Sequence, residues 1–174
     1  MKVKPFLLLA FMQFTFLFIF SCTSLNSFQN FKGDYKYDNF NATIYRDVMG
    51  VPHIFGETDA DAVFGLGYAH SEDDFKTIQD LLLGARGKLG SKYGVKYTPV
   101  DYYVGLIGVW NQVNSRYEKE IPEDIKMICE AYASGINKYA KDNPNLAYRE
   151  LFPLNGKDII AGWMYQIPYL YGIE

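Results

Sequence analysis

The side chains best suited to zinc binding or proton transfer, the histidines, are few and far apart. His53 and His70 are the only two in the sequence, and they are seventeen residues apart. They do not form the HExxH pattern that places two imidazoles on one helix face around a zinc ion. We therefore expect no zinc site, and we expect His53 to hydrogen-bond within a turn beside its strand rather than to act in catalysis.

Carboxylates are more frequent, but their spacing does not fit a metal-binding loop. Five of them lie close together in the sequence: Asp59, Asp61, Glu72, Asp73 and Asp74. A calcium loop requires alternating oxygen ligands and a central glycine, and this stretch has neither. We expect these carboxylates to be solvated or to cap helices, so the sequence predicts no metal ligand and no catalytic residue within the chain.

The elements that would position these residues begin with a hairpin. Residues 42–46 alternate β-branched and aromatic side chains with other types, which is typical of a strand. Residues 47–50 end in glycine and indicate a turn, after which residues 51–55 form a second strand. Pro52 cannot donate a ladder hydrogen bond, so the second strand should lie at a sheet edge. The sequence thus predicts a β-hairpin over residues 42–56.

A long helix is predicted directly after the hairpin. Thr58 and Asp61 have the spacing of a capping box, in which each side chain accepts a hydrogen bond from the other residue's backbone N–H. An apolar stripe then recurs at helical spacing: Val63, Phe64, Gly67, Phe75, Ile78, Leu81 and Leu82. Small residues along this helix allow another backbone to approach closely, and repeated glycines from Gly84 onward end it.

More helices are predicted along the rest of the chain. Residues 95–120 indicate short helices and loops, and Pro122 begins the clearest helix, which Asn143-Pro144-Asn145 ends. One face of that helix is apolar: Ile125, Ile128, Tyr132, Ile136 and Tyr139. A last helix starts near Asn155, and Pro168 bends or ends it. The predicted fold class is therefore mainly α with a short N-terminal β-hairpin.

Length and charge narrow the function classes. The chain has 174 residues, with 17 basic and 20 acidic side chains and no block of one sign. This length favours one globular domain, and a weakly acidic chain lacks the basic surface that nucleic acid binding requires. We expect no nucleic-acid partner.

Residues 1–21 are predicted to be a signal peptide. A positively charged start precedes an apolar run over residues 6–20. At about 1.5 Å per residue this run is too short to cross the roughly 30 Å hydrocarbon core of a bilayer. Residues 19–22, Ile-Phe-Ser-Cys, resemble a bacterial lipobox, which would make Cys22 a lipid anchor in the periplasm or outer membrane. A plain secretory signal, cleaved at a nearby serine, is the alternative.

A flexible tether is predicted after the signal peptide. Residues 22–41 are polar and aromatic by turns, without a period. The folded domain would then comprise residues 42–174. If Cys22 carries a lipid, Cys129 has no disulfide partner, and we expect it to be a small core residue.

Five motifs, taken in order, resemble those of the penicillin acylase family of N-terminal-nucleophile hydrolases, which includes acyl-homoserine-lactone acylases. They are Arg46-Asp47, Gly50-Val51-Pro52-His53-Ile54, Gly65-Leu66-Gly67-Tyr68, Ala85-Arg86-Gly87-Lys88-Leu89 and Ala131-Tyr132-Ala133-Ser134-Gly135-Ile136-Asn137. One departure is Ser71-Glu72-Asp73-Asp74, where the family usually shows Ala-Gln-Asp-Arg. The departure weakens any transfer of substrate preference.

The resemblance implies the α segment of an αββα hydrolase, incomplete without its β segment. In this family a precursor cleaves itself, and the serine that begins the β segment is the nucleophile, with its own α-amino group as base. The implied activity is hydrolysis of a linear amide bond in an N-acyl compound, such as a penicillin or an acyl-homoserine lactone. The implied partners are the β segment, the substrate and, through the lipid, a membrane.

The resemblance also implies a role for the end of the chain. Tyr165, Pro168, Tyr169 and Tyr171 lie where family members place substrate-pocket residues, although ordinary interface aromatics are the alternative. No cofactor is expected, but some family members bind calcium in the complete enzyme through one α-segment glutamate, for which Glu174 aligns only loosely.

Two functions of different class remain open on the sequence. One is the α part of an envelope acylase, inactive alone. The other is a non-catalytic, lipid-anchored binding or structural fragment that keeps the front half of the fold.

Overall fold

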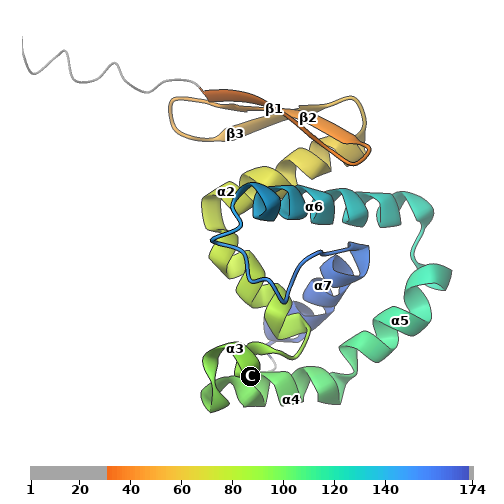
Figure 1. Cartoon of the computed structure of the whole chain (residues 1–174). Coiled ribbons are helices and arrows are strands. Elements are labelled where there is room, and N and C mark those ends of the chain that lie inside the picture. The colour runs from red at the N-terminus through yellow and green to blue at the C-terminus, as the bar shows by residue number, and fades with distance from the viewer. Residues whose placement is uncertain (1–30, 173–174) are drawn as a thin grey trace, which may run out of the picture.

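A computed structural model describes residues 31–172, without the side chains of Phe31 and Tyr169. Its three-stranded antiparallel sheet has the order β1 (Phe31–Tyr37), β2 (Phe40–Arg46) and β3 (Pro52–Gly56). The helical elements are α2 (Asp59–Ala85), α3 (Leu89–Tyr93), the 3-10 helix η2 (Val95–Tyr97), α4 (Thr98–Ile107), α5 (Val109–Glu120), α6 (Glu123–Asp142) and α7 (Gly156–Leu170). The predicted fold class, mainly α with a small N-terminal sheet, is confirmed (Figure 1). The predicted signal peptide, Cys22 and Glu174 lie outside the described residues.

The predicted hairpin is present as β2 and β3, and β3 is an edge strand as expected. The predicted tether is wrong for the part of it that the structure describes, because residues 31–37 form β1 and pair with β2. Tyr35 of β1 packs against Tyr68 of α2 with ring centroids 4.3 Å apart. The sequence of β1 has no apolar run that would predict a strand. Its tyrosines, which alternate with charged residues, nevertheless pack against α2 and stabilise the third strand.

The sheet lies on the first part of α2, and the close contact depends on small residues. Ala42 and Ile44 of β2 are buried against this helix. A Cβ atom at Gly65 would lie 2.5 Å from Ile54 and 2.9 Å from Ala42. Glycine at this point therefore lets the helix backbone contact the sheet directly.

The predicted capping box at the start of α2 is confirmed. The backbone N–H of Asp61 donates to Thr58 Oγ1 at 3.1 Å, and the backbone N–H of Thr58 donates to Asp61 Oδ2 at 3.2 Å. The N–H of Asn41, in β2, also donates to the Asp61 carboxylate at 2.8 Å. One carboxylate thus joins the start of the helix to the sheet.

The helices form two buried clusters along α2. Leu83, Ile136 and Leu151 are fully buried between the second part of α2, α6 and the segment before α7. Val109 and Ala161 belong to a second cluster, formed by α4, α5 and α7. The predicted end of α6 near Asn143 is confirmed, and Pro168 does not end α7, which continues to Leu170.

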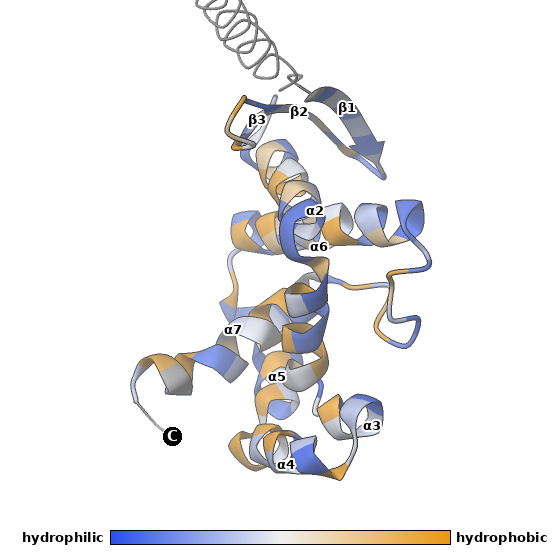
Figure 2. Ribbon diagram, turned by 90° about the vertical axis from the view of Figure 1, so that its left-hand side faces the viewer, coloured by the Kyte–Doolittle hydropathy of each residue, from blue (hydrophilic) through white to orange (hydrophobic). Residues whose placement is uncertain are grey.

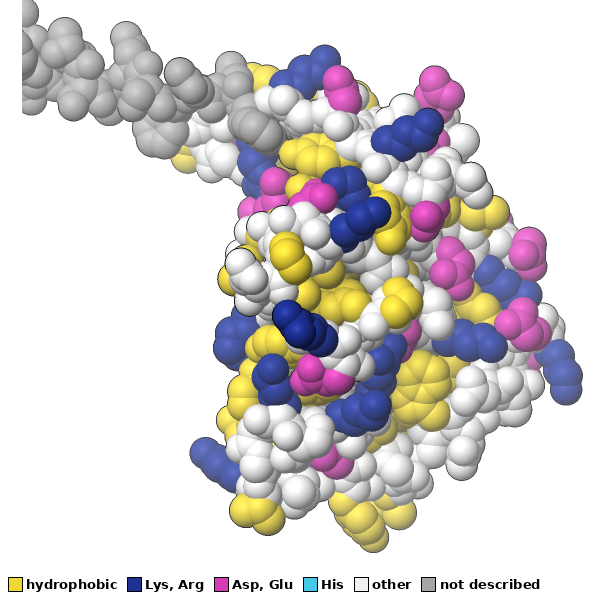
Figure 3. Space-filling model, in the orientation of Figure 1, with side chains coloured by type: hydrophobic (Ala, Val, Ile, Leu, Met, Phe, Trp, Pro, Cys, Tyr) yellow, Lys and Arg dark blue, Asp and Glu magenta, His cyan; other side chains and the backbone are white. Residues whose placement is uncertain are grey.

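The surface of the helical part carries several apolar side chains. Figure 3 shows hydrophobic side chains at the end of the molecule formed by α3, η2 and α4, where Val95, Tyr102 and Leu106 are exposed. Within residues 31–172, no helix combines the length and the apolarity needed to cross a membrane.

Candidate functional site

An apolar groove of about 600 Å³ lies between α2, α6 and α7. Figure 1 shows α7 in the angle between the other two helices. The groove is lined by Val63, Leu66, His70, Ile78, Leu81 and Leu82 of α2, Ile128, Cys129, Tyr132 and Ile136 of α6, and Ile159, Gly162, Trp163 and Gln166 of α7. Three residues of the apolar face that the sequence predicts for α6, Ile128, Tyr132 and Ile136, therefore belong to one wall of the groove.

Large side chains at the lip of the groove are open to solvent. Trp163 is 60% exposed and Leu66 is 46% exposed. Apolar side chains of this size that stand together in the open are characteristic of a surface that another molecule covers. The groove is thus a candidate binding surface.

One polar pair stands in this apolar setting. The hydroxyl of Tyr132 and Nδ1 of His70 are 2.5 Å apart, which joins α6 to α2 across the groove wall. Burial raises the pKa of the Tyr132 hydroxyl, so it stays protonated and can donate to the imidazole. The pair can fix the orientation of His70 towards a bound group.

Cys129 is the nucleophilic side chain of the groove lining, and its setting argues against catalysis. Burial, with a contribution from Glu130, raises the pKa of the Cys129 thiol. A catalytic cysteine needs a lowered pKa because the thiolate is the attacking species. The prediction that Cys129 is a buried core residue is confirmed.

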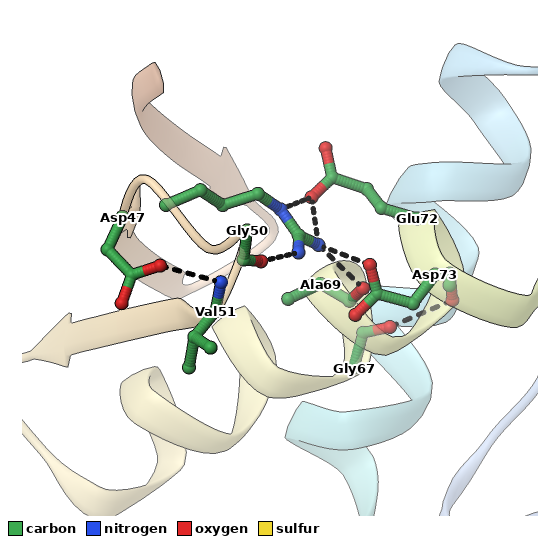
Figure 4. A network of polar contacts seen from close by, with 9 residues as sticks. Asp47, Gly50, Val51, Gly67, Ala69, Glu72 and Asp73 are labelled. Atoms are coloured by element: carbon green, nitrogen blue, oxygen red, sulfur yellow. Dashed lines mark hydrogen bonds and ion pairs between the residues drawn. The ribbon is translucent and has the colours of Figure 1, made fainter. Parts of the chain in front are cut away.

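A charged cluster lies on the other side of α2, where the helix meets the sheet (Figure 4). Arg46, the last residue of β2, donates from Nη2 to Glu72 Oε2 at 3.0 Å and pairs with Asp73 Oδ1 at 2.9 Å. Its guanidinium also donates to the backbone carbonyls of Gly50 at 2.8 Å and Ala69 at 3.1 Å. Burial alone would lower the pKa of Arg46, but the hydrogen bonds to the two carboxylates outweigh it and raise the pKa.

The turn between β2 and β3 is held by the residue that follows Arg46. Asp47 Oδ1 accepts hydrogen bonds from the backbone N–H groups of Met49 at 2.8 Å and Val51 at 3.0 Å, and Oδ2 lies 3.2 Å from Nε2 of His53. These bonds, that of His53 first, lower the pKa of Asp47. His53 therefore supports the turn, as predicted. Gly50 has φ 81°, a conformation that glycine adopts without strain.

The two edges of the sheet differ in character (Figure 2). The β1 edge carries Lys32, Asp34 and Lys36, and charges of this kind discourage pairing with another strand. The β3 edge has no charged residue between Pro52 and Gly56, and Phe55 on it is 62% exposed. The β3 edge is thus the one suited to receive a further strand.

Residues 41–164 match the family described as Penicillin amidase. The chain belongs to the penicillin amidase family. The match covers nearly all of β2, the whole of β3, α2 and α6, the first part of α7, and the charged cluster.

Relatives in this family include two bacterial enzymes. The chain is 31% identical over 99 residues to acyl-homoserine lactone acylase QuiP of Pseudomonas fluorescens strain Pf0-1, a match that covers 57% of this chain and 12% of the relative. It is 29% identical over 115 residues to acyl-homoserine lactone acylase QuiP of Pseudomonas aeruginosa PAO1, covering 66% of this chain and 13% of the relative. The aligned part is therefore about an eighth of the length of these curated relatives.

A solved acylase structure has a similar fold. The chain superposes on a thermostable penicillin G acylase from Alcaligenes faecalis with a TM-score of 0.60 and 20% identity. The superposition covers 83% of this chain and 76% of that chain. The similarity establishes the fold of this family member.

Three of the residues predicted to line a substrate pocket, Tyr165, Pro168 and Tyr171, are not among those that line the groove, and their role as pocket residues stays a prediction. Tyr165 packs into the cluster of α4, α5 and α7, and Tyr171 is exposed beyond the end of α7. Pro168 lies inside α7, and the side chain of Tyr169 falls outside the described part of the chain. The groove instead uses the other face of α7, with Trp163 at its lip.

The apolar stripe predicted for α2 contains four of its groove residues, Val63, Ile78, Leu81 and Leu82, but the sequence analysis missed Leu66 and His70 and the groove residues of α7. Leu66 follows Val63 by three positions and His70 follows Leu66 by four, which is a helical stripe. That spacing was a usable signal. No sequence signal indicated that Trp163 lies opposite this stripe, because its position depends on how α7 returns between α2 and α6.

Proposed function

We propose that this penicillin amidase family chain is the α part of an acylase that hydrolyses a linear amide bond of an N-acyl compound. The nucleophile would be the N-terminal serine of a β segment outside this chain. The observation that carries the proposal is the open apolar groove in a chain of this family: it offers a surface for another polypeptide, while the cysteine in it has a raised pKa. The chain alone is expected to be inactive.

The expected chemistry belongs to the β segment. Its serine hydroxyl would attack the amide carbonyl, and its α-amino group, with an ordinary pKa near 7.7 to 8.0, would accept the proton. Hydrogen-bond donors of that segment would stabilise the oxyanion, an effect worth about 3 to 4 kcal/mol per donor in a serine protease. The α part would contribute the walls around the site.

Two surfaces of the described structure suit this role. The uncharged β3 edge can accept a strand of the β segment through backbone hydrogen bonds. The groove, with Leu66 and Trp163 at its lip, can bury apolar side chains of the same segment. Both surfaces are rigidly supported, the first by the Asp47 turn and the second by packed helices, which lowers the entropic cost of association.

The names of the relatives support the proposed substrate class. QuiP of Pseudomonas fluorescens is named for acyl-homoserine lactones, and another relative, from Pseudomonas strain SE83, is a penicillin acylase proenzyme. The compounds in these two enzyme names, acyl-homoserine lactone and penicillin, both contain an acyl group in an amide bond. We therefore propose an N-acyl amide as substrate. We propose that the protein is located in the cell envelope, to which the predicted signal peptide and the lipid anchor at Cys22 would direct it. We propose calcium only as a ligand of the complete enzyme.

Coexpression of the chain with the β segment from the same source tests the proposal. We expect a stable complex that hydrolyses a chromogenic acyl amide, and we expect neither segment alone to do so. The matched control carries alanine in place of the first serine of the β segment, and it should form the complex without activity. If the native pair forms a complex but hydrolyses no acyl amide, or if the two segments do not associate, the chain is a non-catalytic module.

A further inference from the structure

Helix α2 contains an interruption at Asp74, whose φ of −152° and ψ of 62° are not helical. Asp74 is neither proline nor glycine, so the interruption needs another cause. Its Oδ1 accepts a hydrogen bond from the backbone N–H of Thr77 at 3.3 Å, the arrangement of an N-cap residue. Helix α2 is therefore two helices, residues 59–73 and residues 75–85, joined at Asp74.

The first of these helices ends in two acidic residues, Glu72 and Asp73. Carboxylates at a helix C-terminus are unfavourable because the helix dipole is negative there. Arg46 offsets this charge from the neighbouring strand, with contacts of 3.0 Å and 2.9 Å to the two carboxylates. It also donates to the carbonyl of Ala69 in the last turn, as a basic side chain does when it caps a helix C-terminus.

The two parts of α2 line the same groove from different directions. Residues Val63, Leu66 and His70 come from the first part, and Ile78, Leu81 and Leu82 come from the second. Figure 1 shows the change of direction along α2 between the sheet and α3. The angle at Asp74 therefore shapes one wall of the groove.

We infer that Arg46 is a positioning residue for the groove. Its guanidinium holds the end of the first helix, this fixes the break at Asp74, and the break sets the angle between the two parts of the groove wall. Two departures from the usual family pattern gain a physical role: Glu72 binds Arg46 together with Asp73, which matches the pattern, and Asp74 caps the second helix. The inference rests on the proposed function only in treating the groove as the surface that binds the β segment.

A distance across the break tests this role directly. Spin labels are attached to cysteines that replace Asp59 and Lys76 of the full chain. The native Cys22 and Cys129 are first replaced by alanine. A straight helix of 17 residue steps would place the two Cα atoms about 26 Å apart, at 1.5 Å per residue, and the bend makes this distance shorter. We expect Arg46→Met to lengthen the distance and broaden its distribution.

Matched variants separate a positioning role from a general loss of stability. Arg116→Met removes a similar arginine that pairs with Glu120 on the surface of α5, and it should leave the distance unchanged. Arg46→Lys keeps one charge but cannot contact both carboxylates and the carbonyl together, so it should give an intermediate distance. An Arg46→Met chain that is folded and keeps the original distance overturns the inference.

A second variant keeps the test decisive if Arg46→Met does not fold. Glu72→Gln with Asp73→Asn removes the two carboxylate partners and leaves Arg46 in place, and we expect the distance to lengthen in the same direction. An unchanged distance in this folded variant also overturns the inference. Because the chain is measured alone, failure to reconstitute hydrolysis would contradict the proposed function without affecting this result.

Discussion

Gly67 of α2 and Gly135 of α6 face each other where the two helices cross. A Cβ atom at Gly135 would lie 3.0 Å from the Cα atom of Gly67 and 2.2 Å from the carbonyl oxygen of Phe64. A Cβ atom at Gly67 would lie 2.4 Å from the carbonyl oxygen of Tyr132. The helix backbones are thus in direct contact, and this contact holds two walls of the groove together.

Gly135→Ala should therefore destabilise the fold. The added methyl group meets backbone atoms that cannot move aside, and overpacking of this kind costs about 1 to 3 kcal/mol. Urea unfolding followed by circular dichroism measures the change. The control is Gly105→Ala in α4, where a Cβ atom meets nothing within 4 Å; alanine there should stabilise the helix by up to about 1 kcal/mol. Equal effects of the two substitutions would contradict the packing role of Gly135.

The buried ion pair between α2 and α7 should be critical for stability. Asp158 has a side chain only 1% exposed, and it accepts hydrogen bonds from Arg86 Nε at 2.7 Å and from the backbone N–H of Asn155 at 3.0 Å. Asp158→Ala leaves the arginine partly buried without this partner, a loss that costs about 3 to 5 kcal/mol. The same urea titration tests this, with Glu120→Ala in an exposed pair as a control that should change little. A small effect of Asp158→Ala would mean that water or another group replaces the carboxylate.

Acid should weaken the junction between the sheet and α2. The hydrogen bond from the backbone of Asn41, followed by that from Thr58, lowers the pKa of Asp61 below its ordinary value of 3.8. A lowered pKa means that the ionised carboxylate stabilises the fold above the ordinary value, and that this contribution disappears as the pH falls through the lowered pKa. Melting temperatures measured from pH 7 down to pH 3 should fall below about pH 4, and Asp61→Asn should make the curve flatter. Parallel curves for the two chains would contradict this assignment.

The thiol of Cys129 should be protected in the native chain. It is 7% exposed, and burial raises its pKa, so little reactive thiolate is present at neutral pH. In a Cys22→Ser chain, which has Cys129 as its only cysteine, a disulfide reagent such as DTNB should react slowly before unfolding and rapidly in guanidinium chloride. Rapid reaction in the native chain would show that the groove opens around this residue.

The sequence alone predicted the elements whose signals are local. The capping box of Thr58 and Asp61, the turn before His53 and the proline at the start of α6 each depend on neighbours within a few residues. The structure confirms these features. They could be predicted because backbone hydrogen bonding and the fixed φ angle of proline act over a few neighbouring residues. The order of the family motifs likewise identified the family from sequence.

Only the tertiary structure decided which residues form the site. Strand β1 exists because β2 and the rings of α2 offer it a partner, although its own sequence resembles a tether. The groove lies on the face of α7 that carries Gly162 and Trp163, whereas Tyr165 packs into the cluster of α4, α5 and α7, because the path of that helix back to α2 sets which face meets it. Arg46 and its two partners, Glu72 and Asp73, are 26 positions or more apart in the chain, and long-range contacts of this kind depend on packing rather than on local preference.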